Sequence, residues 1–377
     1  MANQTLPQSL HIASGDLWAG AEVQLYTLVK ALKQKLNVPV SVILLNHGVL
    51  ENKLQQAGIN VTVIDESKIN SGKILRNLYT AIKSLQPDVI HTHRVKENIL
   101  GGIAARACGI PSLRTLHGAS EHHHPWWNFP KRSIQLLDWS CGRYLQCRVV
   151  AVSDDLASML LSEYPENKLR VIENGIDIDE IDNHRIYREY AYQEKKTFRI
   201  GIAGRLVPVK RVDLFIESAR YMMDHHPDMD VSYHIFGDGP MRDELESHSK
   251  SLGTDSIIQF EGHCHDIYKY IQSVDIMLLT SDHEGLPMIL LEAMALGTPV
   301  IAHAAGGIPR LLDHGQCGIL VNDHSASGYA EATYSLLQSP GERASITRKS
   351  RDRVMDHYSA TRNAENYLSV YSECLLK

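Results

Sequence analysis

The stretch VDIMLLTSDHEGLPMILLEAMALGTPVIAHA, residues 274–304, carries the pattern that decides the fold. An apolar run, a glycine-containing loop, an Ala/Leu/Met-rich run and a second apolar run follow one another without interruption. Continuous apolar runs that alternate with helical stretches indicate parallel strands with both sheet faces covered by helices. The stretch is therefore predicted to fold as strand, loop, helix and strand.

The same alternation recurs along both halves of the chain. Short aliphatic runs are SLHIAS, VPVSVILL, INVTVID, PDVIHTH, PSLRTLHG and CRVVAVS in the first half, then TFRIGIAG, MDVSYHIFG, SIIQFEG, VDIMLLT, TPVIAHA and CGILV. The length of 377 residues exceeds the ~250–300 residues that one hydrophobic core usually organises. We expect an α/β protein of two doubly wound, Rossmann-like domains.

The strongly polar residues 177–197 suggest where the first domain ends, because a new apolar run begins directly after them. We expect domains at residues 1–180 and 181–358. The remaining residues 359–377 end in YLSVYSECLLK, whose apolar positions are spaced for one face of a helix. This helix is predicted to pack back on the first domain.

The composition is that of an ordinary globular protein, with 44% hydrophobic and 22% charged residues. The N-terminal residues lack the basic and apolar regions of a signal peptide, and no run reaches the roughly 18 apolar residues of a spanning helix. We therefore expect a cytoplasmic protein, with the inner face of the cell membrane as an alternative. The six cysteines show no C-x-x-C spacing, so free buried thiols are expected.

Charge is distributed unevenly along the sequence. Residues 1–150 contain 16 Lys+Arg against 9 Asp+Glu, a net +7, and the remainder contains 22 against 35, a net −13. Either the first half meets an anionic partner, or the difference is a surface imbalance without function. Because no G-x4-GK[ST] loop and no nucleic-acid recognition module is present, nucleic acid is not an expected partner.

The loop SDHEGLP follows a predicted strand and precedes a predicted helix, which is where ligands of open α/β sheets bind. Gly285 lets backbone N–H groups approach an anion, and Pro287 suits the first helical position. Glu284 and Glu292 stand on either side of this anion site, where carboxylates can bind sugar hydroxyls. The alternative is a helix-start charge at Glu284 and a solvated helix residue at Glu292.

Two cations follow the first strand of the second half, in RIGIAGRLVPVKRVD. Arg205 offers a planar fork for phosphate oxygens and Lys210 a movable point charge, so together they can stabilise a departing diphosphate. In FGDGP, Gly237 and Gly239 either let a strand end approach a nucleotide base or form a structural turn.

The motifs AGRLVPVKRVD, FGDGPMRDEL and EGLPMILLEAMALGTPVIAHAAGGIPRLL resemble the donor domain of GT-B retaining glycosyltransferases of family 4. The first half is similar to the same family in LWAGAEVQLYTLVKAL, PDVIHTH, RTLHG, VVAVSDDL and VIENGID, so the resemblance covers nearly the whole chain. It implies two domains facing across a cleft, and retaining transfer of a hexose or N-acetylhexosamine from a nucleotide sugar, most commonly a UDP-sugar. The implied acceptor is a glycan or a lipid-linked molecule, and no metal or other cofactor is expected.

The resemblance also implies roles for individual residues. The catalytic set is Glu284 beside the transferred sugar, Arg205 and Lys210 on the donor diphosphate, and His117 approaching the sugar from the first domain. Glu292 would hold the ribose. The full set of predicted donor-binding residues is Gly20, Arg205, Lys210, Gly237, Gly239, Gly285, Leu286, Pro287 and Glu292.

Three further residues of the first half are candidates for contacts with the acceptor or the cleft: Ala19, His93 and Asn174. Gly20 lies in a loop that the family usually writes Gly-Gly-Ala-Glu, and Ala19 replaces the first glycine, which predicts a less open loop. Asn174 matches an Asn-Gly signature of the family, although a turn would explain it without a ligand.

Residues 122–148 raise two further hypotheses. His122, His123 and His124 suggest a metal site, but adjacent histidines point in different directions and no second ligand cluster accompanies them. Aromatic and basic residues then alternate over 126–148, which suits either an anionic membrane surface or a core helix with a basic outer face.

Cell-surface polysaccharide biosynthesis, as of lipopolysaccharide or capsule, is the expected context. Rival functions on the same fold are a nucleotide-sugar epimerase, a phosphorylase and a non-catalytic nucleotide-sugar binding protein.

Overall fold

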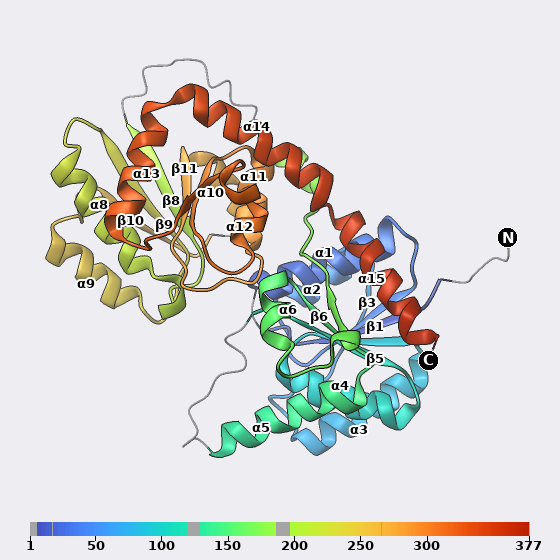
Figure 1. Cartoon of the computed structure of the whole chain (residues 1–377). Helices are drawn as coiled ribbons and strands as arrows, with labels where there is room; N and C mark the ends of the chain where they lie inside the picture. Colours follow the sequence, from blue (N-terminus) through green and yellow to red (C-terminus); the bar gives the residue numbers. More distant parts are fainter. Residues whose placement is uncertain (1–5, 17, 119–128, 186–196, 265, 377) are drawn as a thin grey trace. The chain divides into compact units, whose positions relative to one another are not determined.

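The structure, a computed structural model, describes residues 6–16, 18–118, 129–185, 197–264 and 266–376. The chain forms two compact units (Figure 1). Unit 1 comprises Met1–Gly175 and Ala360–Lys377, and unit 2 comprises Ile176–Ser359. Each unit is built around its own parallel sheet, as the sequence predicts.

The sheet of unit 1 has the order β3-β2-β1-β4-β5-β6-β7 and is parallel throughout. Its order reverses between β1 and β4, so the switch point of the sheet lies between these two strands. The three-residue strand β7 was not expected, because it is short and buries only Leu169. The strands are β1 (Ser9–Ala13), β2 (Val40–Leu44), β3 (Asn60–Val63), β4 (Val89–Thr92), β5 (Ser112–Leu116), β6 (Arg148–Ala151) and β7 (Leu169–Val171).

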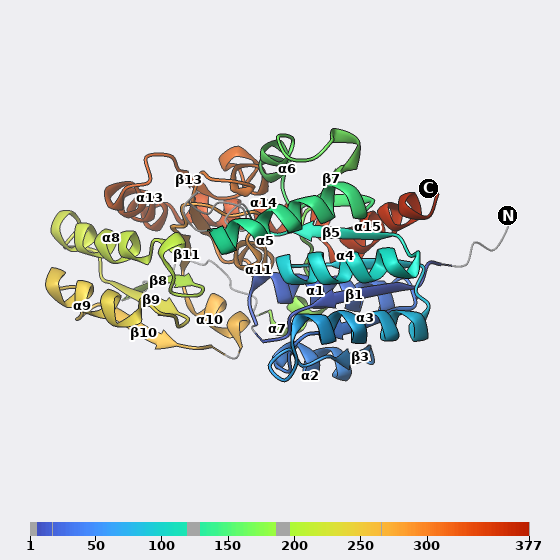
Figure 2. The same ribbon diagram turned by 90° about the horizontal axis from the view of Figure 1, so that it is seen from below.

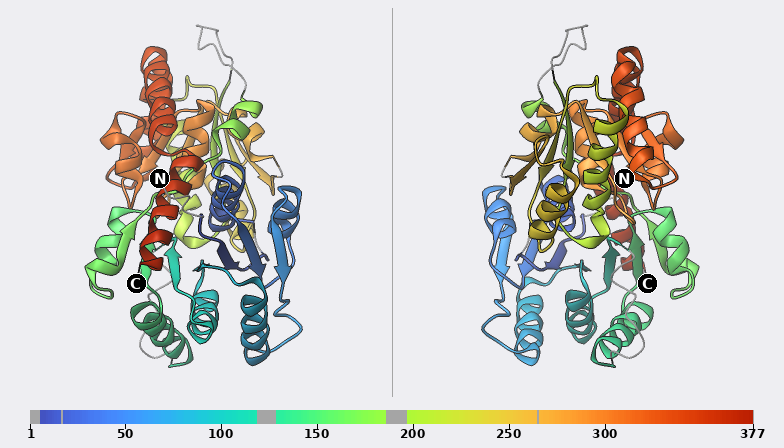
Figure 3. Two further views of the ribbon diagram at one scale, coloured as in Figure 1. Left: turned by 90° about the vertical axis from the view of Figure 1, so that its right-hand side faces the viewer. Right: turned by 90° about the vertical axis from the view of Figure 1, so that its left-hand side faces the viewer.

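Helices cover both faces of this sheet (Figure 3). On one face α1 packs against α15, and on the other α3 runs beside α4 (Figure 2). The helices of unit 1 are α1 (Gly20–Gln34), α2 (Val49–Gln56), α3 (Ser71–Leu85), α4 (Val95–Cys108), α5 (Phe129–Ser140), α6 (Asp154–Leu160) and α15 (Ala360–Leu375).

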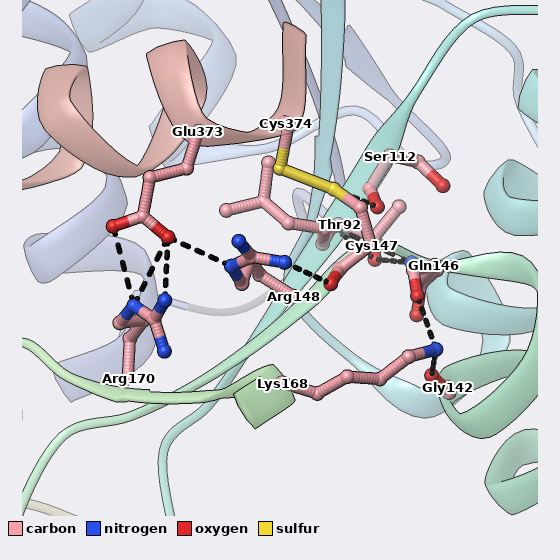
Figure 4. Close-up of a disulfide and its surroundings, with 11 residues drawn as sticks. Thr92, Ser112, Gly142, Gln146, Cys147, Arg148, Lys168, Arg170, Glu373 and Cys374 are labelled. Atoms are coloured by element: carbon pink, nitrogen blue, oxygen red, sulfur yellow. Dashed lines mark hydrogen bonds and ion pairs between the residues drawn. A yellow bond between two sulfur atoms is a disulfide. The ribbon is translucent and has the colours of Figure 1, made fainter. Parts of the chain in front are cut away.

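Helix α15 is fastened to the residue before β6 by a disulfide between Cys147 and Cys374 (Figure 4). Beside the disulfide, Glu373 accepts hydrogen bonds from Arg148 and Arg170. The expectation of free thiols is therefore wrong for these two cysteines, because packing of α15 joins positions 227 residues apart in sequence. The free thiols are Cys108, Cys141, Cys264 and Cys317.

Unit 2 repeats the doubly wound arrangement with the strand order β10-β9-β8-β11-β12-β13, again parallel. The switch point lies between β8 and β11. All six strands coincide with predicted apolar runs: β8 (Phe198–Ala203), β9 (Val231–Phe236), β10 (Ile258–Gly262), β11 (Ile276–Leu279), β12 (Val300–His303) and β13 (Ile319–Val321).

The helices of unit 2 form two neighbouring sets. Helix α13 packs against α8, and α11 packs against α10, α14 and α7. They are α7 (Ile178–His184), α8 (Val212–His225), α9 (Arg242–Leu252), α10 (Ile267–Ser273), α11 (Met288–Leu296), α12 (Ile308–Leu311), α13 (Ala326–Gln338) and α14 (Pro340–His357). Across the described residues of both units, we find no helix with the length and hydropathy to span a bilayer.

The chain passes into unit 2 after Gly175, five residues before the expected boundary at 180, and returns to unit 1 at Ala360. The polar residues 177–197 do not act as a linker throughout, because α7 lies among them and belongs to unit 2. Helix α7 buries only Ile181, which explains why its sequence resembles a connecting segment.

Candidate active site

Most predicted site residues of unit 2 come from two loops at the switch point of its sheet, whereas Gly237 and Gly239 follow β9 and Glu292 lies in α11. One loop follows β8 and contains the short 3-10 helix Pro208–Lys210, and the other follows β11 and leads into α11. Because β8 and β11 are neighbours whose connections run in opposite directions, their carboxyl ends open a crevice between the loops.

Hydrogen bonds tie these two loops together. The Thr280 hydroxyl lies 2.9 Å from the carbonyl oxygens of both Lys210 and Arg211 and donates to them. The backbone N–H of Asp282 donates to the carbonyl of Val209 at 2.9 Å. The two loops are therefore held in one arrangement, which sets the side chains that follow.

Lys210 and Glu284 meet across the crevice, with Nζ 2.6 Å from Oε1. Their side chains are 23% and 14% exposed, so both remain open to a ligand. Arg205 is exposed and lines the same pocket as Lys210, together with Gly204 and Leu206. The two predicted phosphate-binding cations thus share one hollow, and a predicted sugar-binding carboxylate adjoins it.

The turn from Glu284 to Pro287 leads into the start of α11. This helix begins at Met288 with Pro287 as N-cap, so Pro287 precedes the first helical position that was expected for it. Within the turn, Gly285, Leu286 and Pro287 are buried. The first N–H groups of a helix have no intrahelical acceptor, and the helix dipole adds partial positive charge there. The start of α11 therefore complements the two cations.

A glycine that the sequence reasoning did not single out supports this turn. Gly306 has φ +57°, and a Cβ on it would lie 1.8 Å from the carbonyl oxygen of Glu284. The next residue, Gly307, donates its N–H to the carbonyl of Gly285 at 3.0 Å. The signal was present in the sequence as a Gly-Gly pair that follows the next strand after two alanines.

Gly237 and Gly239 serve the other loop in the same way. A Cβ on Gly237 would lie 2.0 Å from the carbonyl oxygen of Gly204, and one on Gly239 would lie 2.4 Å from that of Leu206. The structural-turn alternative accounts for both glycines. Contact with a nucleotide base stays a prediction.

Glu292 lies in the second turn of α11 and is only 6% exposed, so it is not a solvated helix residue. Burial, with a smaller contribution from the nearby Glu180 carboxylate, raises the pKa of Glu292 to about 8. The side chain therefore holds a proton near neutral pH, and as a carboxylic acid it can donate as well as accept a hydrogen bond.

In unit 1, His93 and His117 follow the neighbouring strands β4 and β5 at the carboxyl edge of the sheet. Their rings are stacked with centroids 6.0 Å apart. Burial, aided by Arg94, lowers the pKa of His117 to about 4, and burial lowers the pKa of His93 as well. Both imidazoles are therefore neutral.

The remaining candidates of unit 1 have simple structural settings. Ala19 is the N-cap of α1 in extended conformation, which an alanine adopts without strain, and its N–H donates to Glu22. Gly20 opens α1, with no atom within 4 Å of where its Cβ would be. Asn174 is buried close to the end of unit 1.

Among the described residues, one cluster has the composition of a metal site: His11, His91 and His93, whose ligand atoms lie within 4.8 Å of one another. Five of its six ring nitrogens already form hydrogen bonds. The cluster is therefore a hydrogen-bonded group in this structure. The consecutive histidines 122–124 lie outside the described residues.

The structure describes the segment 126–148 from residue 129 onward. Some of its aromatic and basic side chains are buried, unlike those of a helix that faces a membrane. Trp139 is partly buried and donates from Nε1 to the carbonyl of Glu163, and Arg148 is buried and pairs with Glu373. Exposed apolar side chains remain in and after α5, namely Ile134, Leu136, Leu137 and Tyr144.

Comparison with known proteins identifies similar sequences over most of the chain. A profile described as Glycosyltransferase Family 4 matches residues 18–180, and one described as Glycosyl transferases group 1 matches residues 186–353. The first covers most of unit 1 before α15, and the second contains both loops of the crevice in unit 2.

Individual proteins are similar at lower identity. An uncharacterised glycosyltransferase of Methanocaldococcus jannaschii is 27% identical over 75% of this chain and 75% of its own length. The Escherichia coli UDP-Gal:alpha-D-GlcNAc-diphosphoundecaprenol alpha-1,3-galactosyltransferase is 26% identical over 71% of this chain and 70% of its own. The crystal structure of Anabaena HepE in complex with UDP-glucose superposes with a TM-score of 0.82 at 20% identity, covering 97% of this chain and 100% of HepE.

Proposed function

Because the chain has the GT-B fold and belongs to the group 1, family 4 glycosyltransferases, we propose that it transfers a hexose or N-acetylhexosamine from a UDP-sugar, with retention, to a glycan or lipid-linked acceptor. One observation carries the proposal. Arg205 and Lys210 line one hollow at the switch point of the unit 2 sheet, and Lys210 also pairs with Glu284 in the turn that leads into α11. This set of groups suits a diphosphate joined to a sugar.

Each group has a defined task in the proposed reaction. Lys210 and Arg205 stabilise the negative charge that develops on the departing diphosphate, and the N–H groups at the start of α11 add to that field. When a diphosphate is bound, Lys210 contacts both the phosphate and Glu284. Its contact with Glu284 is then weaker, so the carboxylate oxygens of Glu284 can bind sugar hydroxyls. Glu292 binds the ribose.

Retention is proposed to proceed by front-face attack, in which the leaving phosphate accepts the proton of the incoming hydroxyl. This route gives Lys210 and Arg205 the largest share of transition-state stabilisation and needs neither a protein nucleophile nor a metal ion. Rates unchanged by EDTA, and a product with the anomeric configuration of the donor, are the expected results.

We further propose a role in cell-surface polysaccharide biosynthesis at the inner face of the membrane. Two observations support it: the acceptor named for the Escherichia coli relative is lipid-linked, and α5 exposes Ile134, Leu136 and Leu137. Flotation with anionic vesicles should carry the wild-type protein, and the doubly substituted Leu136→Glu, Leu137→Glu variant should stay behind. Equal flotation of both proteins would show that α5 does not mediate membrane association.

A panel of nucleotides and nucleotide sugars tests the central claim. A ligand that binds only the folded protein raises its Tm, so UDP and one UDP-sugar should give the largest rises. Release of UDP that depends on an acceptor would then establish transfer. A Tm rise without release favours the binding-protein alternative, and a changed sugar on UDP, or phosphate-dependent cleavage, favours an epimerase or a phosphorylase.

A further inference from the structure

Six side chains of unit 1 form one continuous hydrogen-bonded chain beneath α15. In order, they are Tyr367, Thr115, His91, Tyr371, His11 and His93, and the successive contacts measure 2.9, 2.8, 2.9, 3.4 and 3.1 Å. All six are buried. The chain runs from α15 through the sheet to the residue after β4.

Each contact of the chain uses one hydrogen, and a hydroxyl or a neutral imidazole has one to donate. His93 therefore either donates from Nε2 to His11, which leaves Nδ1 without a hydrogen, or accepts at Nε2 from His11, which leaves its hydrogen on Nδ1. Burial lowers the pKa of His11 to about 3 and the pKa values of His91 and His93 well below the usual value, so all three rings are neutral. The free end, Nδ1 of His93, is then either an N–H donor or an acceptor.

This free end lies where the sheet of unit 1 would bind a ligand. His93 follows β4, and the switch point lies between β4 and β1. Among the residues that the structure describes, none forms a hydrogen bond with Nδ1 of His93 or with Nε2 of His117. Two buried ring nitrogens at one sheet edge therefore lack the partners that buried polar atoms normally have.

We propose that Nδ1 of His93 binds a hydroxyl group of a substrate sugar at this edge, and that the chain from Tyr367 to His11 holds the ring in place. The inference rests on the proposed function and adds a binding residue to it. A hydroxyl both donates and accepts, so it satisfies either polarity of the chain. A neutral imidazole gives a phosphate no charge to pair with, which sets this position apart from the cationic hollow of unit 2.

Two substitutions of His93 separate binding from structural support. The side-chain amide of Asn ends where Nδ1 of histidine lies, and that of Gln ends where Nε2 lies. His93→Gln thus keeps the contact with His11 and loses the outward group, and His93→Asn keeps the outward group and loses the contact with His11. The two variants carry the same neutral amide and differ by one methylene group.

We expect opposite effects on stability and activity. His93→Gln should keep a Tm close to wild type and lose at least tenfold in kcat/KM, and His93→Asn should have the lower Tm but stay within threefold of the wild-type kcat/KM. The assay follows UDP release from UDP-glucose, UDP-galactose and UDP-N-acetylglucosamine. Activity losses that follow the Tm losses in both variants, or a fully active His93→Gln, would overturn the proposal.

The assay also distinguishes the source of the hydroxyl. If His93 binds a hydroxyl of the sugar on UDP, His93→Gln should slow UDP release even when water is the only acceptor. If His93 binds a hydroxyl of the acceptor, His93→Gln should slow UDP release only when an acceptor is added. The acceptor used as probe is N-acetylglucosamine linked through diphosphate to a short lipid.

A spectroscopic measurement decides the matter independently of turnover. In ¹⁵N–¹H correlation spectra of the histidine-labelled protein, His93 should be neutral with a single tautomer, and its Nδ1 resonance should move when one of these probes binds. A resonance that no probe moves means that only water occupies the position, which contradicts the proposal. If the wild-type protein releases UDP from none of the probes, the proposed function is contradicted. The shift of the His93 Nδ1 resonance then tests the binding role of His93 by itself.

Discussion

The ion pair of Lys210 and Glu284 is the residue-scale feature on which the proposed chemistry depends. Lys210→Ala or Arg205→Ala should lower kcat by about 10² or more, because each removes a preorganised charge from the departing diphosphate. Lys250→Ala, which changes an exposed lysine on α9, is the control and should leave kcat unchanged. Steady-state UDP release measures the effect, and near-normal rates in both site variants would refute these roles.

Glu292 predicts a pH effect that a single substitution can isolate. Its pKa is about 8 in the folded protein and 4.5 for an unperturbed glutamate. Between these values the folded state keeps the proton and the unfolded state loses it, so the free energy of unfolding falls as pH rises. Glu292→Gln removes this loss. Its Tm relative to wild type should therefore be higher at pH 8 than at pH 5, while its affinity for UDP falls.

A Tm difference between Glu292→Gln and wild type that stays constant over this pH range would show that Glu292 is not protonated by burial. Calorimetric titration with UDP gives the affinity independently of stability.

At the scale of elements, α15 joins unit 1 although it follows unit 2 in the sequence, and the Cys147–Cys374 disulfide fastens it there. A disulfide that closes a long loop restricts the unfolded chain, with a typical effect of about 2–4 kcal/mol. Dithiothreitol should therefore lower the Tm of the wild-type protein by several degrees.

The cysteine variants provide the matched controls. Cys374→Ser should resemble the reduced wild-type protein and not respond to dithiothreitol, and Cys108→Ser, which changes a free thiol on α4, should respond as the wild type does. If reductant lowers the Tm of Cys374→Ser by the same amount, the disulfide does not stabilise α15.

At the scale of the whole molecule, unit 1 contains four histidines whose rings are neutral. His11, His91, His93 and His117 all belong to unit 1, and burial lowers the pKa of each. Above the unperturbed value of 6.5 neither state binds protons at these groups. Below it the unfolded chain binds protons that these groups do not bind in the folded unit, down to about pH 4 for His117 and about pH 3 for His11. Stability therefore falls as pH falls through this window.

Unit 1 should therefore unfold on acidification between pH 6.5 and about pH 3. Tryptophan fluorescence reports this directly, because all four tryptophans of the sequence lie in unit 1. His47→Gln, which changes an exposed histidine, should leave the transition unchanged. A fluorescence signal that stays constant down to pH 3.5 would contradict the prediction.

The sequence by itself determined two parallel-sheet units and the loops that carry the candidate site. Runs of apolar residues mark buried strands locally, and glycine, proline and charged residues mark the turns at their ends. Strand β7 and helix α7 were not predicted from the sequence, because each buries a single residue and so has no run of apolar residues.

Only the tertiary structure decided which distant residues meet. Lys210 and Glu284 are 74 positions apart, and Cys147 and Cys374 are 227 apart. The contact of Gly306 with Glu284 and the hydrogen-bonded chain to His93 likewise depend on strand order and helix packing. Residue spacing fixes local conformation, whereas these contacts arise only when separate strands and helices pack together, so no local pattern encodes them.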